Sequence, residues 1–134
     1  MTHEGHILVV DDEEDIRLLI DEILSEEGYR IHTAADAKAA NVLYGRENPD
    51  LVLLDIWMPE TDGISLLRQW LDDGDLACPV VIMSGHGTVE TAIDAIRLGA
   101  VDYIEKPLSL SNLLKTVEKA LHRKIPVSYT HLRA

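Results

Sequence analysis

Chemically reactive side chains follow four short apolar runs in this sequence. Asp11 and Asp12 follow the stretch 7–10, and Asp55 follows 51–54. Ser84 follows 80–83, and Lys106 comes two residues after 101–104. Each position alone is weak evidence, since an acid after a strand is more often a helix cap or a solvated loop residue. Asp55 alone could be a nucleophile, a metal ligand or such a cap.

If the apolar runs are parallel strands, the four groups would lie together in one site, because the carboxyl ends of such strands meet at the ligand-binding edge of the sheet. Three carboxylates gathered there repel one another, and Lys106 cannot offset them alone. A divalent cation balances the charge, since three negative charges, one lysine and an ion of charge +2 sum to zero. Oxygen ligands in small number favour Mg²⁺ over Zn²⁺ or a full Ca²⁺ cage.

Mg²⁺ beside a carboxylate, a hydroxyl and an ammonium suits phosphoryl transfer. Asp55 would attack phosphorus in line and become an acyl phosphate. Mg²⁺ and Lys106 would hold two equatorial oxygens, and the Ser84 hydroxyl with nearby backbone N–H groups would hold the third.

Strands and amphipathic helices must alternate to position these groups. Apolar stretches predict strands at 7–10, 51–54, 79–83 and 101–104, and an alternating stretch rich in strand-forming residues predicts one at 29–34. Helical spacing of apolar residues predicts helices at 16–24, 37–44, 64–71, 89–96 and 110–121. Strands with four consecutive apolar residues indicate that both faces of the sheet are covered. We therefore expect a doubly wound α/β sandwich with a parallel sheet.

Composition limits the remaining possibilities. The chain has 134 residues, 46% of them hydrophobic, which fits one globular domain. Its net charge of −12 argues against direct nucleic-acid binding, and the single Cys78 excludes an internal disulfide and a cysteine zinc site. Without a signal peptide or a membrane-spanning run, we expect a cytoplasmic protein with no membrane contact.

The division of the chain is expected to be an N-terminal extension at 1–5, one domain at 6–122, and a linker start or a cloning-derived tail at 123–134. Residues 125–134 show no helical or strand period that would extend the fold. His3 and His6 are expected to belong to a mobile terminus rather than a metal site.

The motif set resembles the receiver domain of two-component response regulators over residues 6–122. It consists of Asp11-Asp12, Asp55-Ile56-Trp57-Met58-Pro59, Asp62-Gly63, Ser84-Gly85-His86-Gly87 and Lys106-Pro107. The resemblance implies a flavodoxin-like, five-stranded parallel sheet of order 2-1-3-4-5 with five helices. It further implies that a sensor histidine kinase phosphorylates Asp55.

The resemblance also implies roles for single residues. Asp12 and Asp55 would bind Mg²⁺ directly, Asp11 would support it through water, and the backbone carbonyl of Trp57 would be a further ligand. Ser84 and Lys106 match the hydroxyl and lysine of the family, Tyr103 matches its switch aromatic, and the Lys106–Pro107 bond is expected to be cis.

Two segments, Met83–Ala92 and Ile104–Pro107, more narrowly resemble nitrogen-regulation activators of the NtrC/NtrX type. In those proteins a receiver precedes an ATPase that acts on alternative-sigma-factor polymerase, and then a helix-turn-helix. We expect this chain to be the receiver of such a transcription regulator, with DNA contacted only through an effector domain absent here. It would be a switch that catalyses only its own phosphorylation and dephosphorylation, not a turnover enzyme.

The output surface is expected to be the fourth helix, fifth strand and fifth helix, where mixed charges would allow a homodimer. Trp57 is expected to shield the acyl phosphate from water, the alternative being packing on a neighbouring loop. His86 is a candidate for orienting water or contacting phosphate, the alternative being an exposed loop histidine. For Tyr103 the alternative is a half-buried strand tyrosine without a switching role.

Three rival functions remain. A Mg²⁺-dependent aspartyl-phosphate phosphohydrolase of the haloacid dehalogenase type would need a second Asp where Trp57 stands. A flavin or dinucleotide carrier would need a Gly-rich or Ser/Thr-rich first loop, whereas Asp11-Asp12-Glu13-Glu14 repels phosphate. A degenerate receiver used only for protein docking would not need the intact acidic set.

Overall fold

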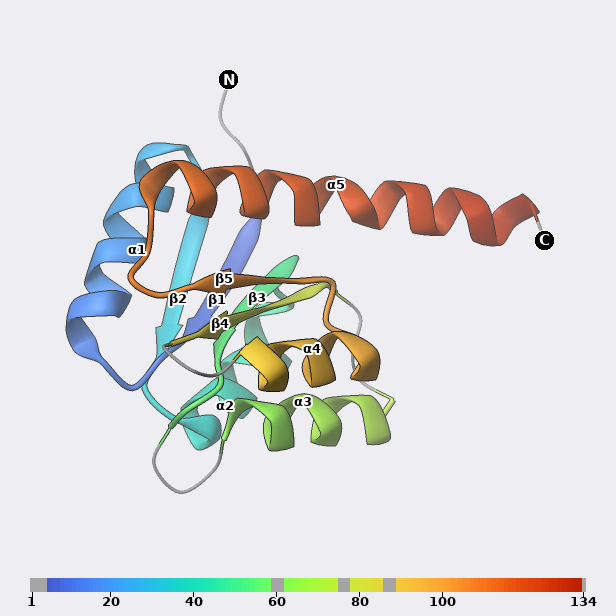
Figure 1. Cartoon of the computed structure of the whole chain (residues 1–134). Helices are drawn as coiled ribbons and strands as arrows, with labels where there is room; N and C mark the ends of the chain where they lie inside the picture. The colour runs from blue at the N-terminus through green and yellow to red at the C-terminus, as the bar shows by residue number, and fades with distance from the viewer. Residues whose placement is uncertain (1–4, 59–61, 75–77, 86–88, 134) are drawn as a thin grey trace.

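The computed structural model describes residues 5–58, 62–74, 78–85 and 89–133 (Figure 1). Within these ranges, five strands alternate with five helices. They are β1 His6–Val10, α1 Glu14–Glu26, β2 Arg30–Ala34, α2 Ala37–Glu47, β3 Leu51–Asp55, α3 Gly63–Asp72, β4 Val80–Ser84, α4 Val89–Leu98, β5 Asp102–Glu105 and α5 Leu110–Arg133. The strands are parallel and run in the order β2-β1-β3-β4-β5, which confirms the predicted flavodoxin-like α/β fold.

Helices cover both faces of the sheet, with α1 and α5 on one side and α2, α3 and α4 on the other (Figure 1). Alternate residues of each central strand enter the two cores, because successive side chains of a strand point to opposite faces. In β1, Ile7 and Val9 pack with α1 and α5, whereas Leu8 and Val10 pack in the opposite core. This double burial explains why the central strands are uninterrupted apolar runs.

Short polar side chains fix where the helices on the second face begin and end. Asp36 caps α2 by accepting a hydrogen bond from the Ala39 N–H at 2.8 Å, and Asp62 caps α3 by accepting one from the Ser65 N–H at 2.7 Å. Asn48 ends α2 in the left-handed conformation, with φ of 50°. Glu47 is therefore the last residue of α2.

A polar and aromatic contact joins α2 to α3. The indole N–H of Trp70 donates to Asn41 Oδ1 at 2.7 Å. The ring of Tyr44 stacks on that of Trp70, with centroids 4.4 Å apart and planes tilted by 15°. Trp70 is only 2% exposed, so its polar atom is paired where water does not reach it.

The last helix is longer than the helical spacing predicted, because α5 continues beyond residue 121 to Arg133 and extends past the sheet (Figure 1). Once a helix has formed, each further residue that carries an N–H can add one backbone hydrogen bond at little cost. In the part of the chain described here, no helix has both the length and the apolar composition needed to cross a membrane.

Candidate functional site

The sheet brings together the four groups that the sequence placed at strand ends. Asp11 follows β1, Asp55 and Ser84 are the last residues of β3 and β4, and Lys106 follows β5. Strand register keeps the ends level, since Val10 pairs with Leu54 and Asp55 pairs with Met83. The convergence at the carboxyl edge follows from the parallel topology.

Lys106 joins two of the carboxylates. Its Nζ lies 2.8 Å from Asp11 Oδ2 and 3.4 Å from Asp55 Oδ1. Its backbone N–H donates to the Ser84 carbonyl at 2.7 Å, which anchors the lysine to the end of β4. The lysine side chain is 16% exposed and that of Asp11 is fully buried, so the pair lies largely out of water.

Backbone and arginine contacts fix Asp11 in place. Its Oδ1 accepts a hydrogen bond from the Glu13 N–H at 2.9 Å. Its backbone carbonyl accepts one from Arg17 Nη1 at 2.8 Å. Sequence reasoning did not find this role for Arg17, because a basic residue in the second turn of an acidic helix usually signals only a solvated face.

The electrostatics of the pocket disfavour the ionised form of Asp55, because the group is buried and the carboxylate of Asp11 already carries a negative charge there. Burial, followed by repulsion from Asp11, raises the pKa of Asp55 to about 7 against the opposing effect of Lys106. Burial by itself would lower the pKa of Lys106, but the hydrogen bond and charge of Asp11 raise it, so Lys106 is held as a cation. The metal-free site therefore carries an unbalanced negative charge.

The carboxylates fit a hard divalent cation. Asp11, Asp12 and Asp55 each offer an oxygen, and these three atoms lie within 4.8 Å of one another. Asp12 is exposed, which leaves the cluster open to solvent on one side. Oxygen-only ligands with an open side suit Mg²⁺, which keeps several of its waters. A bound cation would relieve the repulsion that raises the pKa of Asp55.

Ser84 offers a hydroxyl beside this cluster. The residue is fully buried, and its Oγ has no hydrogen-bond partner among the residues that the structure describes. Buried hydroxyls are usually paired, so an unpaired one in a native structure needs an explanation.

Gly63 sets how closely the start of α3 approaches the end of β3. A Cβ on this residue would clash with the backbone carbonyl of Asp55 and lie 3.2 Å from the Ile56 Cα. The Gly63 N–H donates to the Ile56 carbonyl at 2.7 Å. The sequence placed Gly63 directly before the helix predicted at 64–71, but the contact that requires glycine emerges only from the structure.

The remaining predicted residues differ in how deeply they are buried. Trp57 follows the Asp55 strand and is 56% exposed. Tyr103 is half-buried and packs against the core beneath α2, α3 and α4. The Lys106–Pro107 peptide bond is cis. His86 lies outside the described residues.

Comparison with known proteins gives a family match over most of the chain. Residues 7–118 match the family described as the response regulator receiver domain. The nitrogen assimilation regulatory protein NtrX of Azorhizobium caulinodans is 44% identical over 123 residues, which are 90% of this chain and 26% of that protein. The chain thus spans about a quarter of the length of this relative and of the regulatory protein AtoC of Escherichia coli, which is 39% identical over 121 residues.

Two crystal structures from Brucella abortus are similar to this fold. The receiver domain of NtrX has a TM-score of 0.82 and 47% identity, covering 87% of this chain and 98% of that one. NtrX in complex with ADP has a TM-score of 0.89 and 43% identity, covering 98% of this chain and 30% of that one. In both structures the likeness covers most of the present chain.

Proposed function

This chain belongs to the response regulator receiver domain family, and we propose that Asp55 accepts a phosphoryl group from a sensor histidine kinase. The observation that carries the proposal is the position of Asp55, buried at the carboxyl edge of the sheet beside Lys106 and two further carboxylates. An aspartate in that setting is held at a fixed place and angle, as an in-line nucleophile must be.

Asp11, Asp12, Asp55 and the backbone carbonyl of Trp57 would hold Mg²⁺, with Asp11 acting through water. The ion supplies positive charge that offsets the phosphoryl oxygens and favours the ionised form of Asp55. Such an offset is needed because the pKa of Asp55 is raised to about 7 in the metal-free protein, and only a carboxylate attacks phosphorus.

In the transfer step, one Asp55 carboxylate oxygen forms a bond to the phosphorus of a phosphohistidine. The phosphorus–nitrogen bond breaks, and the imidazole leaves with the electron pair and takes up a proton. Lys106, already 3.4 Å from Asp55, would pair with one phosphoryl oxygen, and the unpaired Ser84 hydroxyl would donate to another.

The new contact of Ser84 would begin the conformational switch. Movement of this residue at the end of β4 would alter the approach to α4, and Tyr103 on the neighbouring β5 would turn inward. The coupling would be a shift between two existing conformations of the domain. Some active form would therefore exist without phosphate.

The surface of α4, β5 and α5 would carry the output to a second copy or an effector domain. Ile93 and Ile96 of α4 are 43% and 38% exposed, and such apolar groups could be covered in a homodimer. Because relatives of this chain include proteins named NtrX, we propose that the output is transcriptional activation in nitrogen regulation. DNA would be contacted only through an effector domain outside this chain.

A turnover phosphohydrolase is the second candidate, since its chemistry also passes through an aspartyl phosphate. Such an enzyme needs an acid or base near the leaving group, and the position two residues after Asp55 holds Trp57. The function supported best is therefore a switch that catalyses only its own phosphorylation and dephosphorylation. A receiver that acts as a docking module without phosphorylation is the remaining alternative.

The test is the intact mass of the protein after incubation with acetyl phosphate, with and without Mg²⁺. We expect the mass to rise by one phosphoryl group only with Mg²⁺, and not in Asp55→Asn. Asp72→Asn, which alters an exposed carboxylate at the end of α3, is the matched control and should react like the wild type.

Failure of the wild type to gain mass would contradict phosphorylation by a small donor. Calorimetry with beryllofluoride then decides between the two remaining readings. Mg²⁺-dependent binding would support a receiver that accepts phosphate only from its kinase, and absence of binding would support the docking module.

A further inference from the structure

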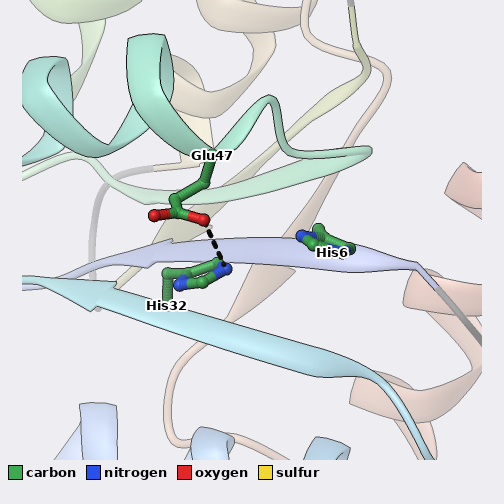
Figure 2. A group of neighbouring side chains, drawn as sticks. All are labelled: His6, His32 and Glu47. Atoms are coloured by element: carbon green, nitrogen blue, oxygen red, sulfur yellow. Dashed lines mark ion pairs between the residues drawn. The ribbon is translucent and has the colours of Figure 1, made fainter.

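A second cluster of metal-ligating side chains lies on the face of the sheet that α2 covers. His6 comes from β1, His32 from β2 and Glu47 from the end of α2 (Figure 2). We propose that these three side chains form a binding site for a divalent transition-metal ion of the Zn²⁺ class. The proposal is independent of phosphorylation at Asp55.

Strand register places the two histidines on one face. His6 pairs with Arg30, and Leu8 pairs with His32, so His6, Leu8 and His32 share a face of the sheet. Leu8 belongs to the core that α2 covers, which identifies that face. The histidines are adjacent in space although 26 positions separate their numbers, 6 and 32, in the sequence.

The third side chain is positioned by the end of α2. The left-handed Asn48 and the following Pro49 stop the helix directly after Glu47. Because α2 returns antiparallel to the strands, its last turn lies over their N-terminal ends (Figure 1). Asp50 then fixes His6, accepting its N–H at 2.9 Å and donating its own N–H to the His6 carbonyl at 2.7 Å.

The donor atoms are already gathered. One nitrogen of each histidine and one carboxylate oxygen of Glu47 lie within 4.8 Å of one another. His32 Nε2 is 3.6 Å from Glu47 Oε1, as the dashed line in Figure 2 marks. A tetrahedral Zn²⁺ with bonds of about 2.0–2.1 Å holds its ligand atoms about 3.4 Å apart. Side-chain adjustments of about 1 Å would therefore complete the site, with water as the fourth ligand.

Two imidazole nitrogens of the cluster are buried without a hydrogen-bond partner among the described residues. His6 Nδ1 and His32 Nε2 make no hydrogen bond within the described part of the chain. The rings lie 5.7 Å apart and are tilted by 37°, so ring stacking does not account for their approach. A metal ion would satisfy one lone pair on each ring and would replace the 3.6 Å ion pair with a direct bond to Glu47.

The donor set selects a different ion from the acidic pocket. Two imidazoles and one carboxylate suit Zn²⁺ and neighbouring transition metals, whereas Mg²⁺ prefers oxygen ligands. Five residue steps along β1, each of about 3.3 Å, place His6 and Asp11 about 16 Å apart at opposite ends of the strand. The two sites would therefore bind their ions separately.

An ion can reach the cluster from solvent, because the side chains of His32 and Glu47 are 21% and 28% exposed. Binding would join β1, β2 and α2 through one ion. Because the unfolded chain lacks this arrangement, the ion would raise the thermal midpoint of unfolding.

Calorimetric titration of the full chain with ZnCl₂, in excess Mg²⁺ to occupy the acidic pocket, tests the proposal. We expect one site in the wild type, and a loss of affinity of about tenfold or more in His6→Gln, His32→Gln and Glu47→Gln. His122→Gln is the matched control, since it removes an exposed imidazole from α5 on the other face of the sheet, and should bind like the wild type.

Circular dichroism without metal checks that each variant is folded. A second readout needs no variant: the imidazole nitrogen resonances of His6 and His32 in the wild type should shift together at one equivalent of Zn²⁺. Equal affinity in all variants, or shifts confined to other histidines, would overturn the proposal. So would the absence of Zn²⁺ binding.

Discussion

The ammonium of Lys106 lies closer to Asp11, at 2.8 Å, than to Asp55, at 3.4 Å. Asp11 thus holds the lysine beside Asp55, which makes only the longer contact. This relationship places a cation where the proposed phosphoryl group would be received. It also makes the lysine a competitor of any divalent ion that the same carboxylates bind.

Removing that competitor should tighten metal binding. In Lys106→Gln we expect a higher affinity for Mg²⁺, because the carboxylates lose their internal cation, together with slower phosphorylation by acetyl phosphate. Calorimetric titration with MgCl₂ measures the first effect and intact mass the second. Lys119→Gln, on the exposed part of α5, is the control. Weaker Mg²⁺ binding in Lys106→Gln would contradict the competition.

The pH dependence of stability should report the raised pKa of Asp55. Its folded pKa of about 7 exceeds the ordinary value of 3.8, so ionisation costs folding stability. The favourable contribution is complete below the unfolded pKa and is lost as pH rises through the folded one. Without Mg²⁺, the free energy of unfolding relative to Asp55→Asn should fall by about 1–3 kcal/mol between pH 4 and 8.

Urea unfolding of the two proteins in EDTA measures this difference, and groups common to both cancel. Added Mg²⁺ should recover part of the loss at pH 8, because the ion binds the ionised carboxylate. A difference that stays constant over the whole pH range would show that Asp55 titrates near its ordinary value.

Two glycines offer a matched pair of substitutions. Gly63→Ala places a Cβ against the Asp55 carbonyl and should destabilise the domain by about 1–3 kcal/mol or more. Gly45→Ala lies within α2, with nothing within 4 Å of the added atom, and should stabilise it by about 0.5–1 kcal/mol. Denaturant midpoints measure both, and equal shifts would refute the close approach at Gly63.

Ser84→Ala should separate folding from phosphate binding. Removing a buried hydroxyl that lacks a partner among the described residues should be neutral or stabilise the unphosphorylated domain by up to about 1 kcal/mol. Beryllofluoride affinity should fall, because the hydroxyl would hold one of its fluorides. Urea unfolding and calorimetry give the two values. A large loss of stability would mean that Ser84 already has a structural hydrogen bond.

Trp57→Ala should shorten the lifetime of the phosphorylated form. The side chain is 56% exposed and stands two residues after Asp55, where it could limit the access of water to the acyl phosphate. The decay of the phosphorylated mass in EDTA measures the effect. Val42→Ala, at 57% exposure on α2, controls for the loss of an exposed apolar group. An unchanged lifetime would assign Trp57 to packing alone.

Sequence reasoning could place Asp11, Asp55, Ser84 and Lys106 together because parallel strands share one carboxyl edge. That inference needs only the order of strands and helices, whereas the order of strands within the sheet came from family resemblance. Sequence reasoning could not show why residue 63 must be a glycine, because that requirement depends on the path of the backbone after β3. Sequence reasoning also ended the last helix at residue 121, whereas α5 continues to Arg133.

The sequence did not predict the cluster of His6, His32 and Glu47, for a different reason. Its members come from three elements, and their meeting depends on strand register and on the residue at which α2 ends. His6 was expected in a mobile terminus, yet it is the first residue of β1. His3 lies outside the described residues.

The contact between α2 and α3 buries one of the two tryptophans of the protein, whereas the other is exposed, so the two can report on different events. Trp70 is 2% exposed, bonded to Asn41 and stacked on Tyr44, so its emission should follow the integrity of the fold. Trp57 is open to solvent beside Asp55, so a water-soluble quencher should reach its indole selectively. Fluorescence quenching can therefore follow events near Asp55 and unfolding separately, in the unlabelled protein.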